Sequence, residues 1–139
     1  MRITLHTVEE ANRQLAAIRP QLERLRGQKR EFDRLETRLD VLLVATAGAA
    51  PENPDAVELR TCSDKRRRLG ESIGRAVTAL HEKGVLVKDL DEGLCDFYAL
   101  QGDRLVFLCW KLGEPEVAHW HTLEGGFASR RPLKSAELE

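Results

Sequence analysis

The sequence predicts an α+β fold: a long antiparallel helical hairpin followed by a small antiparallel β-meander of three to four strands. Apolar residues recur every three or four positions up to residue 83, which is the spacing of one helix face. After Gly84 they recur with a period close to two, which is typical of strands. Glycine-containing turns divide this last third into short segments. At this length we expect a single domain over residues 1–139.

The first helix is expected over residues 7–46. Thr7 and Glu10 have the spacing of a capping box, in which each side chain binds the backbone amide of the other residue. Pro20 interrupts the helical pattern. Because proline lacks an amide donor and crowds the preceding turn, we expect a kink or a fresh helix start near Arg19. The apolar stripe of this helix consists of Leu15, Ile18, Leu22, Leu25, Phe32, Leu35, Leu39 and Leu42.

A second helix is expected over residues 55–83, after a loop of small residues and prolines at 47–54. Gly84 stands where a left-handed C-cap is expected. The strict three- and four-residue steps favour packing like that of a coiled coil. Lys29 and Arg66 fall on the stripes, either as side chains that reach out to solvent or as polar residues that fix register. The second stripe consists of Leu59, Cys62, Arg66, Leu69, Ile73, Ala76 and Leu80.

The meander is expected over residues 85–122, as strands at 85–90, 94–100, 104–112 and 117–122, and residues 123–139 form a C-terminal segment. A two-residue turn at Gly102-Asp103 would pair Gln101 with Arg104. This register places Asp96 opposite Cys109, on the same side of the sheet. Both sides are then largely apolar, so one packs on the hairpin. More helix, the C-terminal segment or a second subunit must cover the other, and a homodimer is the simplest account.

The turn at residues 113–116 determines which side of the sheet carries the histidines. An even-length loop pairs Trp110 with His119 and puts both histidines on the Trp110 side. An odd-length loop pairs Cys109 with His121, which aligns Asp96, Cys109 and His121 across three neighbouring strands. That row could be a nucleophilic set with Cys109 as the nucleophile, or a three-ligand metal site with an open position.

His119 and His121 point the same way from their strand under either register, because they are two residues apart. Both imidazoles could then reach one divalent transition metal such as zinc, and Glu114 or Glu116 could add an oxygen ligand. The alternative is a purely structural role, in which the histidines are hydrogen-bonded parts of an aromatic-rich sheet edge. Further along, Arg130 and Arg131 follow two glycines, a combination that can form an anion-binding pocket or a turn with solvated side chains.

Composition excludes several classes of protein. The 22 Lys and Arg nearly balance the 23 Asp and Glu, so the basic excess of a nucleic-acid-binding protein is missing. The only basic run, residues 65–68, spreads around its helix and is expected to be solvated. No apolar run approaches the roughly 20 residues of a membrane span, and the N-terminus lacks a signal-peptide core. Three cysteines without a C-x-x-C pair argue against a disulfide framework, so we expect a soluble, cytoplasmic protein.

A string of short motifs runs from Gly84 to Leu133, including Gly93-Leu94-x-Asp96-Phe97, Leu108-Cys109-Trp110-x-x-Gly113-Glu114, Trp120-His121 and Arg131-Pro132-Leu133. With Thr7-x-Glu9-Glu10-Ala11-Asn12 and Pro20, this string resembles a small bacterial family catalogued as domain of unknown function 2203, over nearly the whole chain. The resemblance implies kinship but no reaction, substrate or cofactor. It does imply a role for Asp96, Glu114 and His121. The position of His119 is more often aromatic in the family.

Two functions are therefore expected. The first is a small non-catalytic interaction or scaffold module, in which the helical hairpin presents a binding surface and the aromatic sheet anchors a homodimer. The second is a metal-binding protein or metal-dependent hydrolase with a site around His121, Glu114 and Asp96. Binding of nucleic acid through residues 65–68 is not expected.

Overall fold

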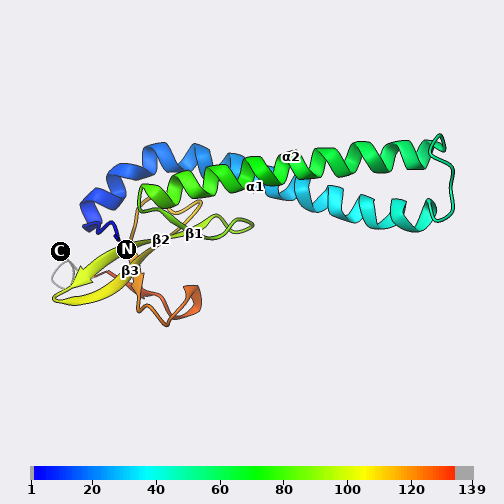
Figure 1. Cartoon of the computed structure of the whole chain (residues 1–139). Helices are drawn as coiled ribbons and strands as arrows, with labels where there is room; N and C mark the ends of the chain where they lie inside the picture. Colours follow the sequence, from blue (N-terminus) through cyan, green and yellow to red (C-terminus); the bar gives the residue numbers. More distant parts are fainter. Residues whose placement is uncertain (1, 134–139) are drawn as a thin grey trace.

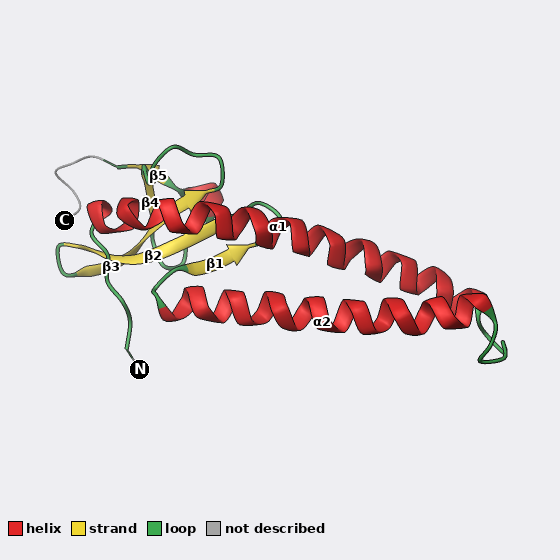
Figure 2. Cartoon of the chain, turned by 90° about the horizontal axis from the view of Figure 1, so that it is seen from above, coloured by secondary structure: helices red, strands yellow, loops and turns green. Residues whose placement is uncertain are grey.

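The computed structural model describes residues 2–133, which form a long helical hairpin with a five-stranded antiparallel sheet at one end (Figure 1). Helix α1 spans Val8–Ala45 and helix α2 spans Pro54–Glu82. The sheet packs beside the base of the hairpin, and the two helices continue well beyond it as a distal arm (Figure 2). The predicted α+β fold class is confirmed.

Helix α1 begins at the predicted capping box. The Thr7 amide donates to Glu10 Oε1 at 2.9 Å, and the Glu10 amide donates to Thr7 Oγ1 at 3.1 Å. The helix continues through Pro20 without a fresh start, and it bends in its first third (Figure 1). Bending is the expected effect of a proline inside a helix, because its ring displaces the preceding turn. Seven of the eight predicted stripe residues are buried, and Phe32 is half-buried.

Helix α2 begins at Asn53, whose side chain accepts from the amides of Asp55 and Ala56. Of its predicted stripe only Leu80 is buried, and the other members are half-buried. A two-helix arm leaves much of each helix open to solvent, which explains this difference. Arg66 lies on the stripe as predicted and forms an ion pair with Glu36 of α1 at 3.0 Å. Both partners are partly exposed, so this ion pair contributes only about 0–1 kcal/mol.

The sheet has the strand order β1-β2-β3-β4-β5, with β1 Leu86–Asp89, β2 Leu94–Gln101, β3 Arg104–Lys111, β4 His119–His121 and β5 Arg131–Pro132. The β2–β3 hairpin has the predicted register, with Gln101 opposite Arg104 and Asp96 opposite Cys109. Strand β5 was not predicted; it adds to β4 at the edge of the sheet. Before α1, Leu5 forms a parallel bridge with Tyr98 of β2, so the N-terminal segment also joins the sheet.

One side of the sheet forms the core with the base of the hairpin. Phe97, Leu108 and Trp110 on this side are completely buried. They pack against Leu15, Ile18, Leu22 and Leu25 of α1 and Leu80 of α2. Burying a side chain of this size stabilises the fold by roughly 1.5–3 kcal/mol. This core fixes the strands that carry the polar residues on the opposite side.

The centre of the opposite side of the sheet is also buried, whereas Leu100 at the end of β2 is 37% exposed. Asp96, Cys109 and His121 lie there with exposed fractions of 2%, 0% and 3%. The segment between β4 and β5, residues 122–130, runs beneath the strands (Figure 1). Of the three covers considered for this side, the C-terminal segment contacts it, through the Thr122 carbonyl and the Arg130 side chain. The sheet alone does not require a second subunit.

Candidate functional site

Strand β4 places its histidines on the side of the sheet that carries Asp96. His119 lies opposite Cys109, and His121 lies opposite Phe107. The even-length pairing of Trp110 with His119 is therefore wrong. The odd-length alternative has the correct side, but its direct pairing of Cys109 with His121 is wrong by two residues.

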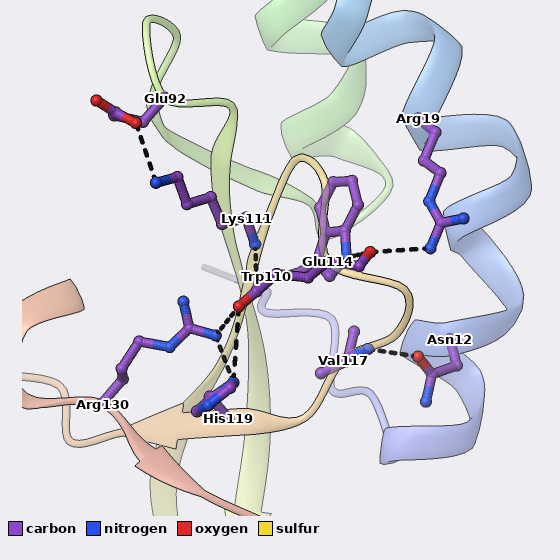
Figure 3. A network of polar contacts seen from close by, with 9 residues as sticks. All are labelled: Asn12, Arg19, Glu92, Trp110, Lys111, Glu114, Val117, His119 and Arg130. Carbon is purple, nitrogen blue, oxygen red and sulfur yellow. Dashed lines mark hydrogen bonds and ion pairs between the residues drawn. The ribbon is translucent and has the colours of Figure 1, made fainter.

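Two α1 side chains hold the β3–β4 connection in place. They account for the difference between the predicted and the observed pairing of β3 with β4. Asn12 Oδ1 accepts from the Val117 amide at 2.7 Å, and Arg19 Nη2 donates to the Glu114 carbonyl at 3.1 Å (Figure 3). The Arg19 guanidinium also lies over the Trp110 ring, 5.6 Å from its centre. The length of this connection is thus set by contacts with a helix about a hundred residues earlier in the chain.

Asp96, Cys109 and His121 nevertheless converge from three neighbouring strands. One ligand atom of each, a carboxylate oxygen, the thiol sulfur and an imidazole nitrogen, lies within 4.8 Å of the others. His121 Nε2 is 3.2 Å from both Asp96 oxygens. Cys109 lies directly opposite His119, two residues before His121 on β4. The His121 side chain therefore reaches Cys109 along the diagonal between the two strands. We call these three residues the buried triad.

The hydrogen bond of His121 Nδ1 determines which ring nitrogen is free to bind a ligand. Nδ1 lies 2.8 Å from the Thr122 carbonyl oxygen, which can only accept a hydrogen bond. Nδ1 therefore carries a proton and donates it. In neutral His121 the lone pair is on Nε2, which faces Asp96. Metal-binding histidines show this arrangement, in which one nitrogen donates to a carbonyl and the other binds the ion.

Burial controls the acid–base properties of the other two triad members. It raises the pKa of Asp96, and the neighbouring His121 opposes this shift. Burial, and then the Asp96 charge, raise the pKa of the Cys109 thiol to about 12. A catalytic cysteine needs a depressed pKa and access to substrate. The geometry therefore lends no support to the predicted nucleophile Cys109, whereas a bound metal ion would lower the thiol pKa directly.

Glu114 and His119, also predicted as ligands, lie together with Arg130 in a separate cluster (Figure 3). Glu114 Oε2 accepts from Arg130 Nη2 at 2.6 Å, and Glu114 Oε1 accepts from the Lys111 amide at 2.8 Å. His119 Nδ1 contacts Arg130 Nη2 and lies 3.9 Å from Glu114 Oε2. We call Glu114, His119 and Arg130 the Arg130 cluster. Its members bind one another and are not part of the buried triad.

Arg130 and Arg131, predicted together as an anion pocket, point to different places. The Arg130 side chain is nearly buried, stacks on Phe127 at 4.6 Å and holds the covering segment against Glu114. Arg131 is exposed and lies over the Trp120 ring, 5.6 Å from its centre. Successive residues of extended chain face opposite sides, so these two guanidinium groups do not share one pocket.

Sequence reasoning missed three groups that build the site: Asn12, Arg19 and the Thr122 carbonyl. Asn12 belongs to the N-terminal motif, so its position in that motif was a signal without an assigned contact. Nothing in the sequence indicates the Thr122 carbonyl, because any residue could supply that oxygen. The basic run at 65–68 behaves as expected of a solvated face. Its side chains pair with Glu31, Glu36, Asp64 and Glu71.

Comparison with known proteins identifies a family but no activity. A family model described as "Uncharacterized conserved protein (DUF2203)" matches residues 4–133. Neither a curated protein nor a solved structure matches the chain. Within the described residues, no helix combines the length and the apolar character that crossing a membrane requires.

Proposed function

The chain belongs to the DUF2203 family of uncharacterized conserved proteins, and we propose that it is a metal-binding protein. Asp96, Cys109 and His121 hold one divalent transition metal such as zinc. The convergence of three ligand atoms of different residues within 4.8 Å, on three adjacent strands, carries this proposal. The Arg130 cluster lies outside the coordination sphere.

The ligand types support a borderline-soft metal. A thiolate, an imidazole and a carboxylate are all zinc ligands, with bonds of roughly 2.0–2.3 Å. Ligands at those distances from one tetrahedral ion lie roughly 3.3–3.8 Å apart, close to the 3.2 Å between His121 Nε2 and the Asp96 oxygens. The His121–Asp96 pair already has this spacing, and no separation among the three ligand atoms exceeds 4.8 Å.

Charge balance supports the same proposal. Two anionic ligands, the Asp96 carboxylate and the Cys109 thiolate, neutralise a dication, so the loaded site carries no net charge when neutral His121 completes it. Neutrality matters because an uncompensated charge is costly at a position with almost no solvent exposure. The burial also favours a structural or storage site over a hydrolase, since a hydrolase needs access for its substrate at the fourth position.

Elemental analysis of protein purified without a His-tag tests the proposal. We expect about one transition-metal ion per chain, lost in His121→Ala. His119→Ala is the matched control, because it removes an imidazole from the same strand and the same side of the sheet. We expect it to retain the metal. Equal metal content in both variants, or a metal-free wild type, would overturn the proposal.

A dimeric scaffold is the second candidate, and the distal arm favours it. Val41, Leu43 and Val44 at the end of α1 are exposed by 53%, 59% and 81%. Apolar residues clustered at the tip of an arm are typical of a protein contact. Light scattering should then show a dimer at micromolar concentration that Val44→Glu dissociates. A monomer in the wild type would exclude this candidate.

A further inference from the structure

A pocket lies where β4 separates from β3, and its lining includes Trp120 and Thr122, the chain neighbours of His121. It has a volume of about 560 Å³, within the range of small-molecule sites. Its walls come from the start of β3, the residues after β4 and strand β5. Arg104 and Arg131 provide its two cationic side chains, and Leu105, Leu123 and Pro132 provide apolar surface.

The two arginines bring positive charge that the described residues do not neutralise. Neither Arg104 nor Arg131 forms an ion pair with a described acidic residue, and Arg131 stacks instead on Trp120. Glu124 also lines the pocket and leaves an excess of one positive charge. Guanidinium groups are the side chains best suited to carboxylate and phosphate, because they offer paired donors in a fixed geometry.

The strand register adds a backbone donor to the same pocket. Gln101 and Arg104 flank a two-residue turn and bind each other. The amide and carbonyl of the next residue, Leu105, therefore face away from β2. Strand β4 pairs with β3 only as far as Phe107, so it leaves Leu105 without a strand partner on that side. An unpaired amide of this kind is a donor for an anion.

Trp120 forms a further wall of the pocket, and its indole N–H is buried with no acceptor among the described residues. A buried donor without a partner is costly, so a ligand oxygen that reaches it gains that free energy. Arg131 covers the indole ring. An anion that binds Arg131 and shifts it slightly would lie beside the indole edge.

We propose that this pocket binds a small organic anion with an apolar body, either a carboxylate or a phosphate monoester. The anionic head binds Arg104, Arg131 and the Leu105 amide, and the apolar body lies against Leu123 and Pro132. None of the three proposed metal ligands lines this pocket, so the proposal does not rest on the metal site.

NMR of the indole groups tests the proposal, because the chain has two tryptophans with different surroundings. Metal-free protein, treated with chelator, is titrated with benzoate, phenyl phosphate and inorganic phosphate. We expect the Trp120 indole and the Leu105 amide to shift saturably with benzoate or phenyl phosphate. The Trp110 indole donates to the Glu114 carbonyl at 3.0 Å and should not move. Benzoate and phenyl phosphate distinguish the two anion types, and inorganic phosphate reports whether the apolar body is needed.

Arg104→Ala and Arg131→Ala should each weaken binding by about tenfold or more, as expected for a lost charge-assisted hydrogen bond. Arg131→Lys keeps the charge and stem and should weaken it less. The control is Arg75→Ala, an exposed arginine on α2. Absence of a saturable shift, wild-type binding in both alanine variants, or equal shifts at Trp110 and Trp120 would overturn the proposal. Asp96→Asn changes a proposed metal ligand on β2 that does not line the pocket, so it should bind the anion normally. Loss of the metal site would therefore not affect this test.

Discussion

His121 contacts oxygen atoms of two residues, Thr122 and Asp96, through its two ring nitrogens. Nδ1 donates to the Thr122 carbonyl at 2.8 Å, and Nε2 lies 3.2 Å from both oxygens of Asp96. The contact between Asp96 and Nε2 is a hydrogen bond only when one of the two carries a proton, because a carboxylate oxygen and a ring lone pair both accept. Either Asp96 is protonated and donates to the ring, or the ring is charged and donates to the carboxylate. A metal ion bound at the proposed site would replace that proton.

Asp96→Asn should remove a pH dependence of the metal-free protein. Burial raises the pKa of Asp96 in the folded state, whereas the unfolded carboxyl titrates near 3.8. Its contribution to stability is therefore complete below about pH 3.8 and is lost as the pH rises through the raised folded pKa. The asparagine amide can still donate to Nε2 but cannot ionise.

Urea unfolding in chelator at a series of pH values measures this difference. The free energy of unfolding of the wild type should fall, relative to that of Asp96→Asn, as the pH rises above 4 or so. Parallel pH profiles for the two proteins would show that Asp96 titrates normally in the fold.

Arg130→Ala should open the cover of the buried triad. Arg130 ties the segment 122–130 to Glu114 by a 2.6 Å charge-assisted bond. Losing such a bond removes roughly 1.5–3 kcal/mol, so local opening should become about tenfold more frequent or more. The measurement is the rate at which a thiol reagent labels Cys109 in metal-free protein, located by mass spectrometry.

The matched control for this experiment is Arg131→Ala, which removes the neighbouring exposed guanidinium. We expect its Cys109 labelling rate to stay close to that of the wild type. Similar rates in all three proteins would mean that Arg130 does not hold the cover closed.

Leu25→Ala and Leu69→Ala should differ in their cost. Leu25 is 2% exposed in the core between the sheet and the helical hairpin, so its removal should cost about 2–5 kcal/mol. The sequence pattern alone predicts the same cost for Leu69. The structure leaves Leu69 half-buried on α2, so we expect a clearly smaller loss. Chemical unfolding of both variants measures the difference, and equal losses would indicate that something covers α2 in solution.

Gly84→Ala should be more destabilising than Gly48→Ala. Both glycines have positive φ, +82° and +76°, so each alanine costs about 1–2 kcal/mol in backbone strain. At Gly84 the added Cβ would also lie 2.7 Å from Thr4 Cβ, whereas nothing lies within 4 Å at Gly48. Overpacking should add about 1–3 kcal/mol at Gly84, measured as a larger drop in unfolding free energy. Equal drops would mean that the N-terminal segment moves aside freely.

The sequence was sufficient to predict the features that depend on residues close together in the chain. Thr7 and Glu10 mark the start of α1, and the two-residue turn at Gly102-Asp103 specifies the whole β2–β3 register. These features depend on backbone geometry over a few residues. The pairing of Asp96 with Cys109 followed directly from that turn.

The features that the sequence could not predict depend on contacts between residues far apart in the chain. The β3–β4 register depends on Asn12 and Arg19 of α1, which no spacing rule relates to Glu114 or Val117. For the same reason Glu114 was grouped with the metal ligands although it binds Arg130. The cover over the triad comes from residues 122–130, whose strand and helix signals are weak.

Cobalt substitution tests the metal site most directly, because the ion reports on its own ligands. Metal-free protein loaded with Co²⁺ should bind one ion per chain and show a thiolate-to-cobalt charge-transfer absorption in the near ultraviolet. Cys109→Ser should lose this absorption, and His119→Ala should keep it. Absence of the band in the wild type, or its persistence in Cys109→Ser, would contradict coordination by Asp96, Cys109 and His121.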